Sequence, residues 1–287
     1  MVPLNVEIFH EMGMGILTIG KEKTMINLFG IIVVYNKNVK NSTTYNCLKK
    51  QKNMKIIVCD NSTKDFGNQE IVIQDGYRYV DMHGNAGLSK AYNKALDCIS
   101  LENPEMKGYV ILFDDDTFIP EDYFKKLKED IKEKRSDIFL PIVRDEVGIL
   151  SPSVMKKYYC HRAPEDVWSI KKEELCGINS GMAIRLKLFK NYRYDERIFL
   201  DYVDHGFIRD MRKRHRKVSI MDTEIRQTFS SNTDDKEKSM IRFQIFKKDI
   251  NEFYRQGFWN RFFFYYVITR RKMQLTRKFR DLRIMFK

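Results

Sequence analysis

Short apolar runs alternate with segments of helical periodicity along the first half of the chain. The runs GIIVVY at 30–35, KIIVC at 55–59 and YVILF at 109–113 are rich in β-branched and aromatic residues. Such runs predict strands that are buried on both faces. A shorter apolar run at 71–73 is a weaker strand candidate. These strands are spaced widely enough for a helix to cross between neighbours.

Two segments between or after these strands have the spacing of amphipathic helices. The first has six apolar residues on one face: Leu88, Ala91, Tyr92, Ala95, Leu96 and Ile99. The second opens at Pro120, a residue favoured in the first turn of a helix, and places Phe124, Leu127 and Ile131 on one face. This alternation predicts an α/β fold with a mostly parallel sheet flanked by helices.

The end of the chain has a different pattern, with aromatic and basic residues interleaved. One predicted helix carries Phe243, Phe246, Ile250, Phe253 and Tyr254 on one face, and Gly257 is a candidate for its end. A second apolar stripe follows at Leu275, Phe279, Leu282 and Phe286. We therefore expect a helical tail over 236–287, a central domain over 26–235, and an N-terminal extension over 1–25 whose order the sequence leaves open.

Charge separates the tail from the rest of the chain. The net charge is +13, and residues 236–287 contain 15 Lys and Arg against 4 Asp and Glu. A basic helix with an aromatic face is typical of binding to an anionic membrane surface. The alternative is a helix packed on the central domain with its basic face in solvent. No module that reads nucleic-acid bases accompanies the tail, so we expect no nucleic-acid partner.

Cysteine usage and hydropathy bear on the compartment. The five cysteines are Cys47, Cys59, Cys98, Cys160 and Cys176. They are odd in number and widely spaced, which indicates a reduced chain rather than a disulfide scaffold or a zinc site. The first residues do not resemble a signal peptide, and no apolar run of about 18 residues is present. We therefore expect a cytoplasmic protein associated peripherally with the inner face of the plasma membrane.

Candidate chemistry lies directly after the predicted strands, where ligands bind in open parallel sheets. The first two strands are followed by Tyr35-Asn36 and Asp60-Asn61-Ser62. The third is followed by Asp114-Asp115-Asp116, three carboxylates that repel one another unless a cation is present. Mg²⁺ or Mn²⁺ typically links such carboxylates to the phosphates of a substrate. The alternative interpretation is an acidic turn in solvent.

Six segments in order resemble the family 2 glycosyltransferases of the GT-A fold, particularly the bacterial rhamnosyltransferase-like branch. They are VVYN at 33–36, VCDNST at 58–63, GNAGLSKAYNKAL at 84–96, ILFDDDTFIPEDYF at 111–124, GINSGMAIR at 177–185 and YDERIFLDYVDHGF at 194–207. The resemblance covers about residues 26–230. It implies a nucleotide-diphospho-sugar transferase with a divalent cation.

The resemblance also implies roles for individual residues. Nucleotide-sugar binding falls on Tyr35, Asn36, Asp60, Asn85, Gly87, Leu88, Asp114 and Asp115. Asp114 and Asp116 form the Asp-x-Asp pair that holds the metal, and Asn179, Ser180 and Gly181 shape the pocket for the donor sugar and acceptor. Plain structural roles remain open for some of these, since Tyr35 could cap the sheet and Gly87 could serve only its turn.

Two carboxylates compete for the role of catalytic base. Asp204 is favoured over Asp201, and the alternative for both is a pair of acids at the start of a helix. The resemblance also places a metal-binding His further along in many relatives, where this chain offers Gln227.

These features predict an inverting glycosyltransferase that uses a UDP- or dTDP-linked sugar. A single displacement needs one metal to stabilise the leaving diphosphate and one base to deprotonate the acceptor hydroxyl. The expected acceptor is a saccharide or a lipid-linked saccharide in cell-surface polysaccharide synthesis. The competing class is a sugar-phosphate nucleotidyltransferase, which also uses an acidic metal site. That class is expected to have a Gly-rich basic loop after its first strand, and none follows Tyr35.

Overall fold

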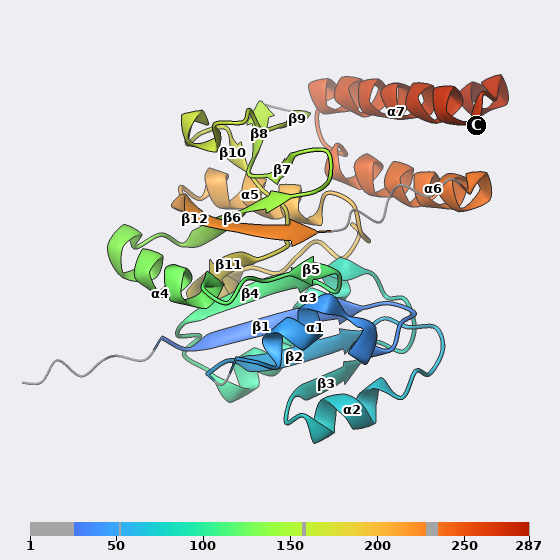
Figure 1. The fold of residues 1–287 in the computed structure, drawn as a ribbon. Helices are drawn as coiled ribbons and strands as arrows, with labels where there is room; N and C mark the ends of the chain where they lie inside the picture. The colour runs from blue at the N-terminus through green and yellow to red at the C-terminus, as the bar shows by residue number, and fades with distance from the viewer. Residues whose placement is uncertain (1–25, 52, 157–158, 228–234, 287) are drawn as a thin grey trace, which may run out of the picture.

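A mixed β-sheet runs through the molecule and carries helices on both faces (Figure 1). The computed structural model describes residues 26–51, 53–156, 159–227 and 235–286, so the predicted extension at 1–25 lies outside the described residues. The main path of the sheet, in spatial order, is β3 (Arg78–Asp81), β2 (Lys55–Asp60), β1 (Leu28–Val34), β4 (Tyr109–Asp114), β11 (Met182–Arg185), β6 (Ile138–Arg144), β12 (Val218–Gln227) and β5 (Thr117–Phe118). A short strand, β7 (Ile149–Ser151), pairs with β6 off this path.

The predicted parallel unit is the first half of this sheet. Strands β3, β2, β1 and β4 are all parallel, and the predicted runs at 30–35, 55–59 and 109–113 form β1, β2 and β4. Strand β11 is antiparallel to both β4 and β6, whereas β12 is parallel to β6. The carboxyl ends of β1, β2, β4 and β12 consequently reach the same region of the molecule.

The apolar runs are continuous because the sheet is buried on both faces. Along β1, Phe29 and Ile31 belong to one hydrophobic core, while Leu28, Ile32 and Val34 belong to the other. Successive side chains of a strand point to opposite faces, so both sets must be apolar.

The helices divide between the two cores. The first core is covered by α3 (Leu88–Glu102), α5 (Val203–Lys213), α6 (Lys236–Phe253) and α7 (Phe258–Phe279). The second core is covered by α1 (Thr43–Leu48), α2 (Asn68–Gln74) and α4 (Tyr123–Lys134). Short 3-10 helices occur at η1 (Val39–Asn41), η2 (Val167–Ser169), η3 (Leu186–Asn191) and η4 (Leu282–Phe286).

Two sequence-based expectations about single elements are wrong. The apolar run at 71–73 lies in helix α2, where only Val72 is fully buried and Ile73 is exposed. A run of three apolar residues fits one helical turn as well as a strand, so periodicity cannot separate them. The helix expected from Pro120 begins three residues later, at Tyr123.

The tail is helical, as predicted, but its elements are divided differently. Helix α6 ends at Phe253, and Gly257 precedes α7 rather than ending α6. The aromatic stretch is the first half of α7, which stops at Arg280 in a left-handed conformation. The stripe expected from Leu275 to Phe286 is therefore broken, and Leu282 and Phe286 are exposed.

A small second sheet and the tail helices form the upper part of Figure 1. The sheet consists of β10 (Leu175–Cys176), β8 (Ser153–Lys156) and β9 (Tyr159–Arg162), with β8 in the middle. Helix α7 contacts β9, since Tyr266 packs edge-on against Tyr159 at 5.8 Å. None of the helices in the described ranges is both long and apolar enough to cross a bilayer.

Candidate active site

The acidic turn after β4 is held from the second core by helix α1. Ser42 Oγ donates a hydrogen bond to the carbonyl of Asp115 at 2.6 Å, and Thr44 Oγ1 bonds the carbonyl of Asp114. The N–H of Thr117 in turn donates to Thr44 Oγ1 at 2.9 Å. With its backbone polar groups satisfied in this way, the turn presents three carboxylates at the end of the strand.

A hydrogen-bond network joins two of those carboxylates to β11 and β12. The amide of Gln227 donates to Asp114 at 2.8 Å and to Asp116 at 3.2 Å. Ser180 Oγ contacts both the Asp114 carboxylate and Gln227 Oε1. Gln227 thus lies where the resemblance placed a metal-binding His in other chains.

Burial and neighbouring negative charges raise the pKa values of two carboxyl groups in this turn, those of Asp114 and Asp116. Burial raises the pKa of Asp114, and the carboxylates of Asp115 and Asp204 raise it further. Burial and the charges of Asp114 and Asp115 raise the pKa of Asp116 to about 6. The carboxylate of Asp115 forms an ion pair with Lys37, whose Nζ lies 3.0 Å away.

These residues fit the divalent cation that the sequence implies. Their ligand atoms are oxygens, which Mg²⁺ and Mn²⁺ prefer, and a cation would relieve the repulsion that raises the pKa of Asp116. Two carboxylates with room for substrate phosphates are a common donor set for Mg²⁺. Gln227 carries an amide oxygen as well as the donating nitrogen, so it also fits the edge of such a site.

At the ends of β1 and β2, side chains clamp the two neighbouring loops together. Asp60 is buried and accepts hydrogen bonds from Asn68, Tyr79 and the N–H of Ser62 at 2.8–3.2 Å. Asn36 receives bonds from the N–H and hydroxyl of Thr63 and donates its own N–H to Ser62. The sequence did not point to Asn68 or Tyr79, because their contacts with Asp60 join residues that are 8 and 19 positions apart.

The aromatic ring that follows β1 is left open to solvent. Half of the surface of Tyr35 is exposed, although it directly follows a strand in which every residue except Val33 is buried. An exposed ring beside buried polar groups is available to stack on a ligand. The role of Tyr35 in nucleotide binding stays a prediction.

Gly87 allows two distant backbone segments to touch. Its φ is +90°, and a Cβ there would meet Phe199 Cδ2 at 2.5 Å and Phe199 O at 2.8 Å. The next residue, Leu88, begins α3 and donates its N–H to Phe199 O at 2.6 Å. Gly87 and Leu88 therefore join the start of α3 to the segment that leads into α5. Asn85, in the preceding turn, is exposed.

The segment 179–181 connects the small sheet to β11. Gly181 has φ +72°, and a Cβ there would meet Ile225 at 2.7 Å and Pro141 at 2.9 Å. Asn179 is buried, and its side-chain oxygen lacks a partner among the described residues. Together with Ser180 on Asp114, these contacts place the predicted pocket residues beside the acidic turn.

The two candidate bases have different surroundings. Asp201 forms a two-pronged ion pair with Arg242 of α6, with one contact at 2.6 Å. Asp204 lies in the first turn of α5, and its negative charge is one of those that raise the pKa of Asp114. Asp201 is therefore engaged by α6, whereas Asp204 is not part of that ion pair.

Asp204 also contacts its neighbour His205. Its Oδ1 lies 2.5 Å from His205 Nδ1 and 2.7 Å from the His205 N–H. Burial by itself lowers the pKa of His205, but the Asp204 carboxylate and the Cys176 thiol outweigh burial and raise it to about 9.

Helix α6 fixes the segment that carries these acids. Asp249 is fully buried, and its carboxylate accepts the N–H groups of three consecutive residues at 2.7–2.8 Å: Phe199, Leu200 and Asp201. Burial raises the pKa of Asp249, and these hydrogen bonds oppose that shift. The pattern of apolar residues along this helix did not single out Asp249. The feature that marks it in the sequence is a carboxylate on the otherwise apolar helix face that carries Phe246, Ile250 and Phe253.

Comparison with known proteins decides the family. The model for "Glycosyl transferase family 2" matches residues 31–193, which is more than half of the chain. The chain belongs to glycosyl transferase family 2. The family match includes the acidic turn and the 179–181 segment, and it ends before Asp201, Asp204 and Gln227.

Individual relatives agree with the family assignment. A dTDP-rhamnosyl transferase, RfbF of Shigella flexneri, is 26% identical over 187 residues. The alignment spans 62% of this chain and only 60% of that relative. Two crystal structures of S. aureus TarS 1-349, one in complex with UDP, match 79% of this chain and 66% of theirs. Their TM-scores are 0.51 and 0.52 at 19% and 18% identity, which shows that the folds are alike.

Proposed function

We propose that this family 2 member is an inverting glycosyltransferase that uses a nucleoside-diphosphate sugar. The observation that carries the proposal is the acidic turn at the end of β4, where the Gln227 amide donates to Asp114 at 2.8 Å and to Asp116 at 3.2 Å. The base that we assign is Asp204 in the first turn of α5. A reaction of this class needs an acidic cation site and a separate base. The names of the relatives support dTDP or UDP as the nucleotide. Family membership argues against a nucleotidyltransferase.

In the proposed reaction, each side of the site handles one half of the displacement. The exposed ring of Tyr35 and the clamped loops around Asp60 receive the nucleoside. Asp114 and Asp116 would hold Mg²⁺ or Mn²⁺, whose charge stabilises the leaving diphosphate. Asp204 accepts the proton of the acceptor hydroxyl as that oxygen bonds to the anomeric carbon. Because the nucleophile attacks opposite the leaving group, the anomeric configuration inverts.

A screen of dTDP- and UDP-sugars with Mg²⁺ and with Mn²⁺ tests the proposal. Consumption of one donor with transfer to a saccharide acceptor, and a product of inverted configuration by NMR, are the expected results. A product with retained configuration would contradict the assignment of Asp204 as a base acting on the acceptor.

Asp116→Ala tests the cation site by calorimetry of UDP and dTDP. We expect cation-dependent binding to be lost, because the remaining carboxylate of the pair is tied to Ser180 and Gln227. Asp122→Ala, which removes a carboxylate paired with Lys126 on the exposed start of α4, is the matched control. Equal cation dependence in both variants rules out the assignment.

We also propose that α7 attaches the enzyme to an anionic membrane surface. Aromatic residues at helical spacing are exposed along its first half: Phe258, Trp259, Phe262, Tyr265 and Tyr266. Its second half and the residues after it carry Arg270, Arg271, Lys272, Arg277, Lys278 and Arg280. Each basic residue near an anionic bilayer contributes about 1 kcal/mol, and aromatic rings favour the interface. Such a location suits a lipid-linked acceptor.

The double substitution Phe262→Ser with Tyr265→Ser tests this surface without disturbing the core, because both side chains are exposed. We expect sedimentation with vesicles of anionic phospholipid to fall several-fold at low salt, and wild-type binding to weaken as salt rises. Leu101→Ser, at an exposed position on α3, is the control. If wild-type protein does not sediment with such vesicles at low salt, the proposal is refuted.

A further inference from the structure

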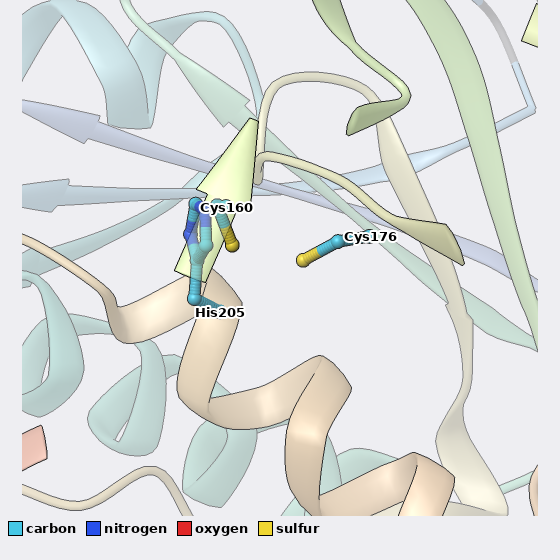
Figure 2. Close-up of side chains that lie close together, drawn as sticks. All are labelled: Cys160, Cys176 and His205. Carbon is cyan, nitrogen blue, oxygen red and sulfur yellow. The ribbon is translucent and has the colours of Figure 1, made fainter. Parts of the chain in front are cut away.

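Three side chains that can bind a transition metal meet between the small sheet and α5. Cys160 comes from β9, Cys176 ends β10, and His205 lies in the first turn of α5 (Figure 2). One ligand atom from each lies within 4.8 Å of the others. Cys176 is fully buried, while the other two are half-buried. Their separation in sequence explains why the spacing of the cysteines pointed away from a zinc site.

The size of this cluster suits a four-coordinate ion. Zinc binds thiolate sulfur at about 2.3 Å and imidazole nitrogen at about 2.0–2.1 Å, so tetrahedral ligands are about 3.5–3.8 Å apart. Side-chain rotations of about an ångström bring three atoms that lie within 4.8 Å to that spacing. Two sulfurs and one nitrogen are soft or intermediate donors, which favour zinc over the Mg²⁺ or Mn²⁺ expected at the acidic turn.

A carboxylate already orients the histidine. With Nδ1 of His205 at 2.5 Å from Asp204 Oδ1, Nε2 is the ring nitrogen left for a metal. Metal-binding histidines almost always bond a carboxylate or carbonyl through their second nitrogen. The ring of Tyr202 stacks on the His205 ring at 4.8 Å and limits its rotation.

A cavity borders this cluster at Cys160. It has a volume of about 170 Å³ and is lined in part by Cys160, Tyr202 and Arg209. A water molecule occupies about 30 Å³ of liquid volume, so the cavity has room for a solvent ligand. Three protein ligands and one solvent ligand form a known arrangement for zinc.

We propose that Cys160, Cys176 and His205 bind a zinc ion that ties the small sheet to the start of α5. The ion joins three elements that are remote in sequence, and through His205 it holds the Asp204 carboxylate. His205 and the cysteines are thus positioning residues for Asp204. The proposal does not depend on the identity of the donor sugar or on glycosyl transfer itself.

The test is metal binding by the full chain, purified under reducing conditions. We expect elemental analysis to find one zinc per chain. After exchange for Co²⁺, we expect a near-ultraviolet absorption band from charge transfer between thiolate and cobalt. Cys160→Ser and Cys176→Ser should each weaken Co²⁺ binding at least about 100-fold, and Asp204→Asn should weaken it about 10–100-fold.

Two variants separate this site from other metal-binding groups. Cys47→Ser removes a half-buried thiol on α1 and should leave the band unchanged. Asp116→Ala removes the acidic-turn ligand and should leave it unchanged as well. The wild-type spectrum by itself decides the matter if a cysteine variant fails to fold. Reduced wild-type protein without a thiolate–cobalt band overturns the proposal, as does a Cys160–Cys176 disulfide that accounts for all chains under these conditions.

Discussion

The two sides of the proposed site are held in place by different kinds of contact. On the donor side, at the ends of β1, β2 and β4, each loop is tied to the loop of an adjacent strand or to α1, as Asn36 is to Thr63. On the acceptor side, residues 199–205 depend on α6, through Asp249 and Arg242. Donor binding and catalysis are therefore separable by substitution.

The largest difference between the effect on kcat and the effect on donor affinity is expected at Asp204. Asp204→Asn should lower kcat by about 10²–10⁴-fold, the usual contribution of a general base, while the affinity for the donor nucleotide stays nearly unchanged. Asp201→Asn should lose much less, because Asp201 is paired with Arg242. Single-turnover kinetics and nucleotide calorimetry measure the two effects. If Asp201→Asn shows the larger loss, the two roles must be exchanged.

A smaller loss of kcat, again with donor affinity retained, is expected at Asp249, which is not proposed to touch either substrate. Asp249→Asn leaves at least one backbone N–H of residues 199–201 poorly bonded, so the Asp204 segment shifts. A shift of about 1 Å at a reacting group costs about 10²-fold, so we expect kcat to fall about 10–100-fold with donor affinity retained. Glu237→Gln, on the exposed first turn of α6, is the control. Equal loss of donor binding and kcat would contradict the separation of the two sides.

On the donor side, the smallest effect concerns stability rather than rate. The pKa of Asp116 is raised from 3.8 to about 6, so its ionisation costs the folded state free energy. The contribution of Asp116 to wild-type stability therefore decreases as pH rises from about 4 to about 6 and stays lower above that range. Asp116→Asn removes this cost and should raise the free energy of unfolding near pH 8 by about 1–2 kcal/mol, after allowance for partial exposure.

Urea denaturation without divalent cations, at about pH 4 and about pH 8, measures that difference. The gain should shrink toward pH 4, where the wild-type carboxyl is protonated in both states. Saturating Mn²⁺ should reduce the gain at pH 8 by stabilising wild-type protein. A variant less stable than wild type at pH 8 would show that Asp116 ionises without cost.

The same contrast explains what could be predicted from the sequence. The position of the donor side could be predicted, because Tyr35, Asp60 and Asp114 lie at or directly after the ends of parallel strands, and these ends must meet at one edge. The binding roles of these residues stay predictions. Their neighbourhood follows from strand order alone, without knowledge of distant contacts. Gln227 was found only through the resemblance, and β12 does bring it to the acidic turn.

The acceptor side and the metal-binding cluster depend on contacts between distant segments. The hydrogen bond between the Asp249 carboxylate and the N–H of Phe199 joins residues 50 positions apart. Periodicity predicts which face of a helix is apolar, but it does not predict which distant segment that helix contacts. The same limit applies to Cys160, Cys176 and His205, which come from three elements. The break at Arg280 in the last predicted apolar stripe could not be foreseen either, since Leu282 and Phe286 continue the helical spacing after the helix has stopped.

The position of Asp249 has a consequence for how the enzyme matures on the ribosome. The strands of the donor side, and even Ser180 and Gln227, are synthesised before the carboxylate that fixes the catalytic segment, which follows residue 199 by 50 positions. At about 5–20 residues per second, that interval lasts a few seconds. During that interval the nascent chain already contains the residues proposed for nucleotide binding. The segment that carries Asp204 still lacks the carboxylate that anchors it.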